Sequence, residues 1–241
     1  MNDFESPQIF DGAVIQDEAA VSRFVSNVFS WMVAGLMLTG VVAYYVAASG
    51  AWSLLISESG GMSLLGWVAM LSPLAFILAM NMGFQRWSAG ALVALFLAFA
   101  VVMGVSLSSI FILYAGTTIF QVFGITSLTF LVMAIVGYTT KQDLTSFGQL
   151  LFMALIGIII ASVVNWFLGS AGLDYIISIV GVLVFVGLIA YDTQKVKRIG
   201  AGVEYGTASA TKLAILGATS LYLDFVNLFL FLLRLFGGRR D

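Results

Sequence analysis

Ionisable side chains are rare in this sequence, and the one in the most unusual place is Asp224, near the middle of the apolar run Leu213–Phe236. That run of about 24 residues would span about 36 Å as a helix, more than the roughly 30 Å of a bilayer's hydrocarbon core. Placing an aspartate at that depth raises the free energy of membrane insertion by about 2.5–3.5 kcal/mol. Each Leu, Ile, Phe or Val lowers it by about 0.3–0.6 kcal/mol. The segment is therefore expected to insert with Asp224 facing protein or water, and such a residue is a candidate functional group.

A second carboxylate, Asp192, closes the preceding apolar run. Alone, it is most simply a boundary residue that is solvated or pairs with Lys195 or Lys197. If the helix continues past Asp192 into those lysines, however, the carboxyl group could meet that of Asp224 on the neighbouring helix. Two carboxylates in contact cannot both ionise cheaply, so they would share one proton. Such a pair is a pH sensor made without histidine, and when ionised it offers two hard oxygen ligands for a transient Ca²⁺ ion.

Other polar residues near these aspartates or near span ends are candidates for supporting roles. They are Tyr191, Tyr222, Asn227, Arg234 and Arg86. The alternative for the asparagine is a hydrogen bond between helices, and for the arginines an anchoring position at the membrane interface.

The composition restricts the class of protein. Hydrophobic residues make up 61% of the 241 residues and charged residues only 9%, which indicates an all-α polytopic membrane protein. The chain has no cysteine and no histidine, and it has no phosphate-binding loop or hydrolase motif. We therefore expect no enzyme activity and no cofactor. The net charge of −2 gives no reason to expect a nucleic-acid partner.

Seven spans are predicted between an acidic tail, residues 1–22, and a short basic tail, residues 237–241. Within the membrane domain, 23–236, the spans cover about 24–48, 62–84, 89–113, 119–138, 147–168, 175–191 and 213–236. The division between the third and fourth spans rests only on Gly116 and two threonines.

The loop charges predict the orientation. With a cytoplasmic N-terminus, the inner segments hold seven of the ten basic residues and the three intervening outer loops hold none. The other three basic residues, Arg234, Arg239 and Arg240, would then lie outside. The alternative is a last span that enters and returns, which would place all ten inside. Seven full spans with a cytoplasmic N-terminus are the interpretation that we adopt.

Three stretches resemble the Bax inhibitor family, also called the transmembrane Bax-inhibitor-motif family. Residues 220–229, SLYLDFVNLF, continued by LRLFG at 233–237, are similar to its C-terminal signature. Residues 186–195, VGLIAYDTQK, resemble its sixth-span signature, and residues 137–144, GYTTKQDL, resemble a link in the bacterial branch. The resemblance covers essentially the whole chain after the tail.

The resemblance implies a seven-helix fold with the C-terminal helix at the centre, and a pH-sensitive passive leak of Ca²⁺ governed by an aspartate pair. Asp192 and Asp224 are the residues in the two matching motifs. Some members have an acidic residue in the second span that pairs with the basic residue of the last span. The second span here has no ionisable residue, so a backbone carbonyl or a lipid phosphate is the expected partner of Arg234.

Three functions remain open at this stage. The first is the proton-gated cation leak, with Ca²⁺ as the transported ion and the lipid bilayer as surroundings. The second is regulation of a membrane-embedded quality-control protease through the acidic tail. The third is a secondary transporter that uses Asp224 as its proton site. The expected location is a bacterial inner membrane.

Overall fold

The computed structural model describes residues 18–57 and 61–237, and within these ranges the chain is helical. The elements are α1 (Glu18–Ala48), η1 (Ala51–Leu55), α2 (Leu64–Gly83), α3 (Ala89–Leu107), α4 (Ile110–Leu113), α5 (Gly116–Thr139), α6 (Thr145–Leu168), α7 (Ala171–Gly202) and α8 (Ala208–Phe236). Most of the acidic tail (1–17) and the last four residues of the basic tail (238–241) lie outside the described residues.

Seven of the helical stretches are long and apolar enough to cross a membrane, which confirms the predicted fold class. The short helix α4 completes the third of them, Ala89–Leu113, after a break at two serines. Helices α1, α7 and α8 extend well beyond the predicted apolar runs. Apolar runs mark the part of a helix inside the membrane, not the ends of the helix. The segment 192–212 between the last two apolar runs is therefore mostly helical, and only the turn at 203–207 separates α7 from α8.

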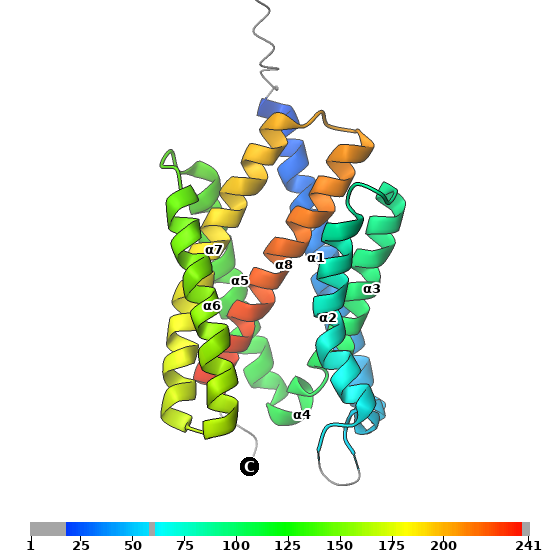
Figure 1. Ribbon diagram of the computed structural model, residues 1–241, viewed down its shortest axis with the longest axis vertical. Coiled ribbons are helices and arrows are strands. Elements are labelled where there is room, and N and C mark those ends of the chain that lie inside the picture. The colour runs from blue at the N-terminus through cyan, green and yellow to red at the C-terminus, as the bar shows by residue number, and fades with distance from the viewer. Residues whose placement is uncertain (1–17, 58–60, 238–241) are drawn as a thin grey trace, which may run out of the picture.

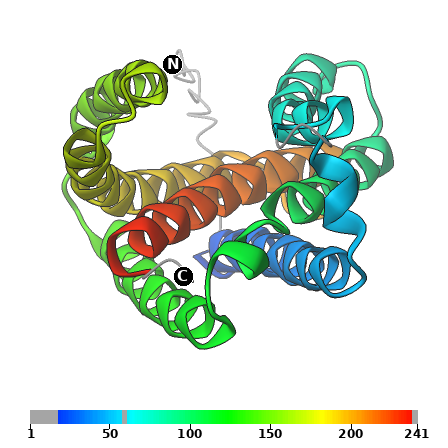
Figure 2. The same cartoon turned by 90° about the horizontal axis from the view of Figure 1, so that it is seen from below.

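Helix α8 lies at the centre of the bundle (Figures 1 and 2). It buries 67% of its most apolar stretch, whereas the other six spans bury 17–44% of theirs. Its contacts are with α7, α1, α5, α3 and, less extensively, α2. Helix α6 stands outside this ring and packs against α7. A continuous α8 from residue 208 to residue 236 gives no re-entrant turn.

Short polar side chains set the helix ends. Ser63, Ser88, Ser170 and Thr207 begin α2, α3, α7 and α8, and each accepts a hydrogen bond from a backbone N–H of the first turn. Helix α6 ends at Gly169, which has a φ of 62°, a left-handed conformation that favours glycine.

Pro73 lies inside α2 without ending it. A proline at this position cannot donate a backbone hydrogen bond to the carbonyl of Ala69, four residues earlier. The hydroxyl of Ser106 on α3 donates to that carbonyl instead. A freed carbonyl in the membrane is thus satisfied by the neighbouring helix, so α2 and α3 are joined where the proline would otherwise weaken α2.

Small residues bring the helix backbones together. A Cβ atom added to Gly137 on α5 would overlap the backbone of Ala190 on α7, two residues before Asp192. On the other side of the bundle, the Thr39 hydroxyl on α1 donates to the carbonyl of Ala100 on α3 at 2.8 Å. These close approaches fix the positions of the helices that surround α8.

We predict that Gly137→Ala destabilises the folded protein by about 1–3 kcal/mol, because α5 would have to move away from the α7 backbone. The measurement is the melting temperature of the purified protein in detergent. Gly124→Ala in the same helix is the matched control, since a Cβ atom there meets nothing within 4 Å. Equal losses in the two variants would show that this close approach does not limit stability.

Candidate functional site

Asp224 lies in the middle of α8 and is buried, with 5% of its surface exposed. Its neighbours along the buried face are apolar, Leu221, Phe225 and Leu228. The side-chain atom Oδ2 is buried and has no hydrogen-bond partner among the described residues. A polar atom left in this state in a membrane helix is costly, so it marks Asp224 as a residue that packing alone does not explain.

Asp192 on α7 is the polar group that meets Asp224. Helix α7 continues ten residues past Asp192, to Gly202, and α7 and α8 share the most extensive contact between helices in the described chain. The two carboxyl groups lie close enough to share a hydrogen bond. Such a bond needs a proton on one of the two groups, because an ionised carboxylate has no donor. The structure therefore brings together the two aspartates that the sequence singled out.

Lys195 is the basic residue whose charge acts on both carboxyl groups. It lies one turn beyond Asp192 on α7 and forms no ion pair within 4.0 Å among the described residues. Its positive charge favours a negative charge on the pair without neutralising it directly.

A cavity of about 270 Å³ leads to Asp192 from between α2, α7 and α8. Its polar lining consists of Asp192, Lys195, Asn81, Thr219 and Ser220. The cavity is large enough for several water molecules, and it reaches Asp192 but not the buried Asp224.

Tyr222 lies two residues before Asp224 and faces a different part of the bundle. Its hydroxyl and that of Thr39 on α1 are 2.7 Å apart, and its ring packs edge-on against Phe96 and Phe99 of α3. Residues two apart in a helix point in nearly opposite directions. Tyr222 therefore attaches α8 to α1 and α3, while Asp224 faces α7.

The other predicted supporting residues also lie away from the pair. Tyr191 packs against Gly148 of α6, and Asn227 donates to the carbonyl of Leu223 in its own helix. Arg234 lies 3.7 Å from Asp174 at the opposite end of α7, in a cavity of about 840 Å³. Arg86 is exposed in the turn after α2. The expected carbonyl or lipid partner of Arg234 is thus replaced in this structure by Asp174.

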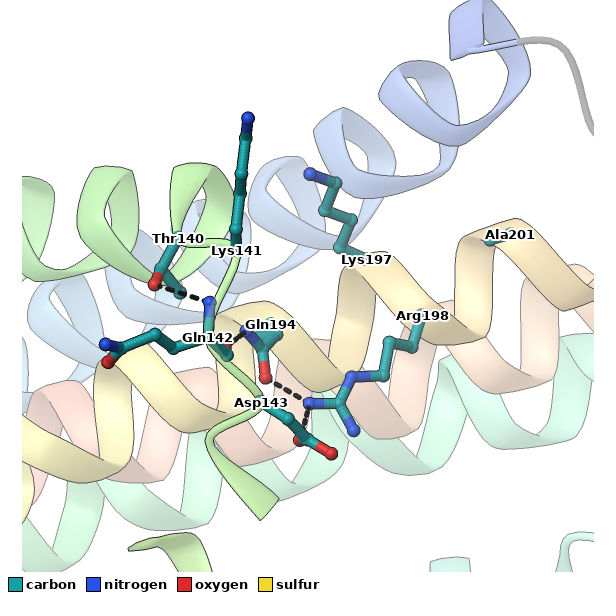
Figure 3. A pocket seen from close by; sticks show the side chains of 8 residues that line it. All are labelled: Thr140, Lys141, Gln142, Asp143, Gln194, Lys197, Arg198 and Ala201. Atoms are coloured by element: carbon teal, nitrogen blue, oxygen red, sulfur yellow. Dashed lines mark hydrogen bonds and ion pairs between the residues drawn. The ribbon is translucent and has the colours of Figure 1, made fainter.

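The α5–α6 loop is held against α7, directly after Asp192 (Figure 3). Gln194 is buried, and it accepts a hydrogen bond from the N–H of Leu144 and donates one to the carbonyl of Gln142, at 2.9 and 2.7 Å. Arg198 binds Asp143 at 2.5 Å and also contacts Gln194. Residues Gln194 and Arg198 with Gln142, Asp143 and Leu144 are called the loop clamp below.

The sequence offered only a weak signal for the loop clamp. In the sequence, Asp143 and Lys141 stand in a short polar link that is most simply a solvated loop, and no motif marks Gln194. Polar residues at a membrane interface look solvated whether or not they bind one another, so their pairing is not visible in the order of residues. One available signal was the spacing of Gln194 and Arg198, which places both on one face of a continued α7.

Asp143 is fully exposed, and its pKa is lowered from 3.8 to about 2. The causes are hydrogen bonds from the side chain and backbone of Thr145, followed by the bond from Arg198. A lowered folded-state pKa means that the contribution to stability is fully present above pH 3.8 and is lost as the pH falls through 2. The loop clamp is therefore insensitive to pH between 5 and 8.

Within the described residues, no group of three or more His, Cys, Asp or Glu side chains gathers as a metal site. The aspartate pair supplies two carboxylates, whereas Ca²⁺ takes six to eight oxygen ligands at a stable site.

Seven helices that can span a membrane, with α8 and its buried Asp224 enclosed by the others, define a polytopic membrane protein. The family described as "Inhibitor of apoptosis-promoting Bax1" matches residues 21–241, and this chain belongs to that family.

Bacterial proteins are similar over nearly their whole length. The "Inner membrane protein YbhL" of Escherichia coli strain K12 is 44% identical over 95% of this chain and 97% of its own. "Uncharacterized protein RP147" of Rickettsia prowazekii is 41% identical over 93% of each chain, and a protein of Borreliella burgdorferi is 40% identical over 91% of this chain and 94% of its own.

We predict that Asp143→Asn lowers the melting temperature by a constant margin between pH 5 and pH 8, because the loop clamp loses its ion pair. Below about pH 4 the margin should shrink, since the wild-type carboxylate becomes protonated as the pH approaches 2. Melting curves in detergent across this range are the measurement. Glu204→Gln removes an acid at the same end of α7 that forms no ion pair in the described structure, and it should show no such margin. A margin that grows on acidification would contradict the assignment.

Proposed function

We propose that the protein is a pH-sensitive passive Ca²⁺ leak whose ion path passes the Asp192–Asp224 pair. The observation that supports this proposal is the buried carboxyl group of Asp224 on the central helix close to that of Asp192, which lines a cavity between α2, α7 and α8. The family resemblance adds Ca²⁺ as the transported ion. The proposal describes a passive channel without catalytic chemistry or a bound cofactor.

The proposed mechanism has two states of the pair. In one state the two carboxyl groups share a proton and a hydrogen bond, and α7 lies closely against α8. In the other state both are ionised, and like charges in a low-dielectric environment repel each other. Separation then widens the path between α7 and α8, and the freed oxygens can exchange with the hydration shell of a cation.

In this proposal the aspartate pair senses protons, because the neighbouring helices bring few other ionisable groups near it. Helices α2 and α3, which pack on α8, contain no ionisable residue, and α5 contains only Tyr138 at its end. The charged residues of α1, Glu18 and Arg23, lie in its first two turns. On α7 and α8, Lys195 is the base that acts on the pair, and the phenol of Tyr222 is directed to Thr39.

We further propose that the protein lies in the inner membrane with its N-terminus in the cytoplasm. The similar Escherichia coli protein is named as an inner membrane protein. Basic residues gather where α1 begins, α2 ends and the α7–α8 turn lies, which is the upper end in Figure 1. Such residues favour the cytoplasmic side.

We predict that Asp224→Asn abolishes the pH dependence of Ca²⁺ flux from proteoliposomes, because an amide cannot take up or release the shared proton. The measurement is the rate of Ca²⁺ release from reconstituted vesicles between pH 5 and 8. Asp143→Asn is the control, since that aspartate does not titrate in this range and the variant should keep the wild-type pH profile.

Two outcomes would contradict the proposal. One is wild-type flux that never differs from that of empty vesicles. The other is a pH profile that is the same in Asp224→Asn as in the wild type.

A further inference from the structure

Residues of the loop clamp line both sides of a second cavity, of about 510 Å³, at the end of the bundle where basic residues gather. The loop residues Thr140, Lys141, Gln142 and Asp143 line one side, and the α7 residues Gln194, Lys197, Arg198 and Ala201 line the other (Figure 3). This cavity is separate from the one that leads to Asp192, because the two share no lining residue.

The charges in this cavity do not balance. Arg198 is engaged by Asp143, Gln194 and Thr145 within the clamp. Lys141 and Lys197 are left without a carboxylate partner among the described residues. In Figure 3 both lysine side chains extend away from Asp143, whereas Arg198 turns toward it. The cavity therefore presents two uncompensated positive charges.

Lys197 is held in place before any ligand arrives. Its Nζ atom donates to the carbonyl of Tyr138 at 2.8 Å and lies 4.6 Å from the centre of the Tyr138 ring. An ammonium group has three donors, so two remain for a ligand after this bond. A preorganised donor loses less conformational entropy on binding than a free lysine does.

Exposed apolar side chains lie on α5 and α6 near the loop that joins them. Phe147 and Leu150 at the start of α6 are 47% and 56% exposed, and Ile135 and Val136 at the end of α5 are 54% and 45% exposed. In a membrane protein such a face contacts acyl chains. A ligand with an anionic head and apolar tails would match both the two lysines and the helices below them.

We propose that Lys141 and Lys197 form a binding site for the phosphodiester headgroup of an anionic phospholipid in the cytoplasmic leaflet, with the acyl chains lying along α5 and α6. This site is independent of the proposed ion path. A free phosphate shares the headgroup's chemistry, but it would make no use of the exposed apolar face.

The test measures lipid binding by the full-length protein in detergent, with native mass spectrometry of bound phosphatidylglycerol and phosphatidylcholine. The wild type should retain phosphatidylglycerol in preference to phosphatidylcholine. Lys141→Gln and Lys197→Gln should each weaken phosphatidylglycerol binding about fivefold, because each removes one of the two ammonium groups that contact the anionic headgroup. The double variant should lose about 25-fold if the two contributions add.

Arg23→Gln is the matched control, because Arg23 is an exposed base at the same end of the bundle and lies outside the cavity. It should keep wild-type binding. Competition by millimolar inorganic phosphate tests whether the site binds a lipid headgroup or a free phosphate ion. If phosphate displaces the lipid only at high concentration, the lipid is the ligand, and if the two compete equally, the site takes free phosphate and the lipid proposal is overturned.

Equal retention of the two lipids by the wild type would also overturn the proposal, as would an equal loss in Arg23→Gln and Lys141→Gln. Lys141 is exposed in a loop and its side chain forms no hydrogen bond or ion pair in the described structure, so its variant should fold normally. A failure of Ca²⁺ flux would leave this outcome unchanged, since the readout is lipid binding alone.

Discussion

The constraint on which this structure depends is the burial of a carboxyl group at the centre of a membrane bundle. An aspartate on the surface of a span would face lipid at a cost of several kcal/mol, so the helix that carries Asp224 has to be enclosed by others. Enclosure explains why α8 is the most buried span although it is not the most apolar. It also explains why the neighbouring acid matters, because Asp192 on α7 is close enough to act on the carboxyl group of Asp224 at that depth.

The elements around the pair satisfy their own polar groups locally. Ser106 donates to the carbonyl that Pro73 releases, and Thr39 links the Tyr222 hydroxyl to the carbonyl of Ala100. At the end of α7, the loop clamp uses Gln194 and Arg198 in the same way. These bonds are made mainly by hydroxyl and amide groups, or by an acid that titrates far below neutrality. The bundle can thus remain intact over a pH range in which a shared proton at the aspartate pair is exchanged.

The sequence predicted the fold class well because each span must meet the same requirement for length and apolarity. The expectation that Asp192 meets Asp224 required the sixth span to continue past Asp192, and α7 does continue to Gly202. The sequence did not predict where Tyr222 or Arg234 point. Helical spacing alone argues against Tyr222 beside Asp224, whereas Asp174 as the partner of Arg234 depends on how α7 and α8 pack. The loop clamp depends on a tertiary contact between polar residues 50 or more positions apart.

The attachment of Tyr222 makes the two sides of α8 unequal. Toward α1 and α3, α8 is fastened by neutral hydrogen bonds and by aromatic rings packed edge to edge, and neither changes with proton concentration. Toward α7, the central polar contact is one that charge repulsion can break. In this arrangement α1, α3 and α8 would stay together, and α7 would be the helix that moves. Any opening driven by loss of the shared proton would be a displacement of α7, and α6 together with the α5–α6 loop would be carried along with it.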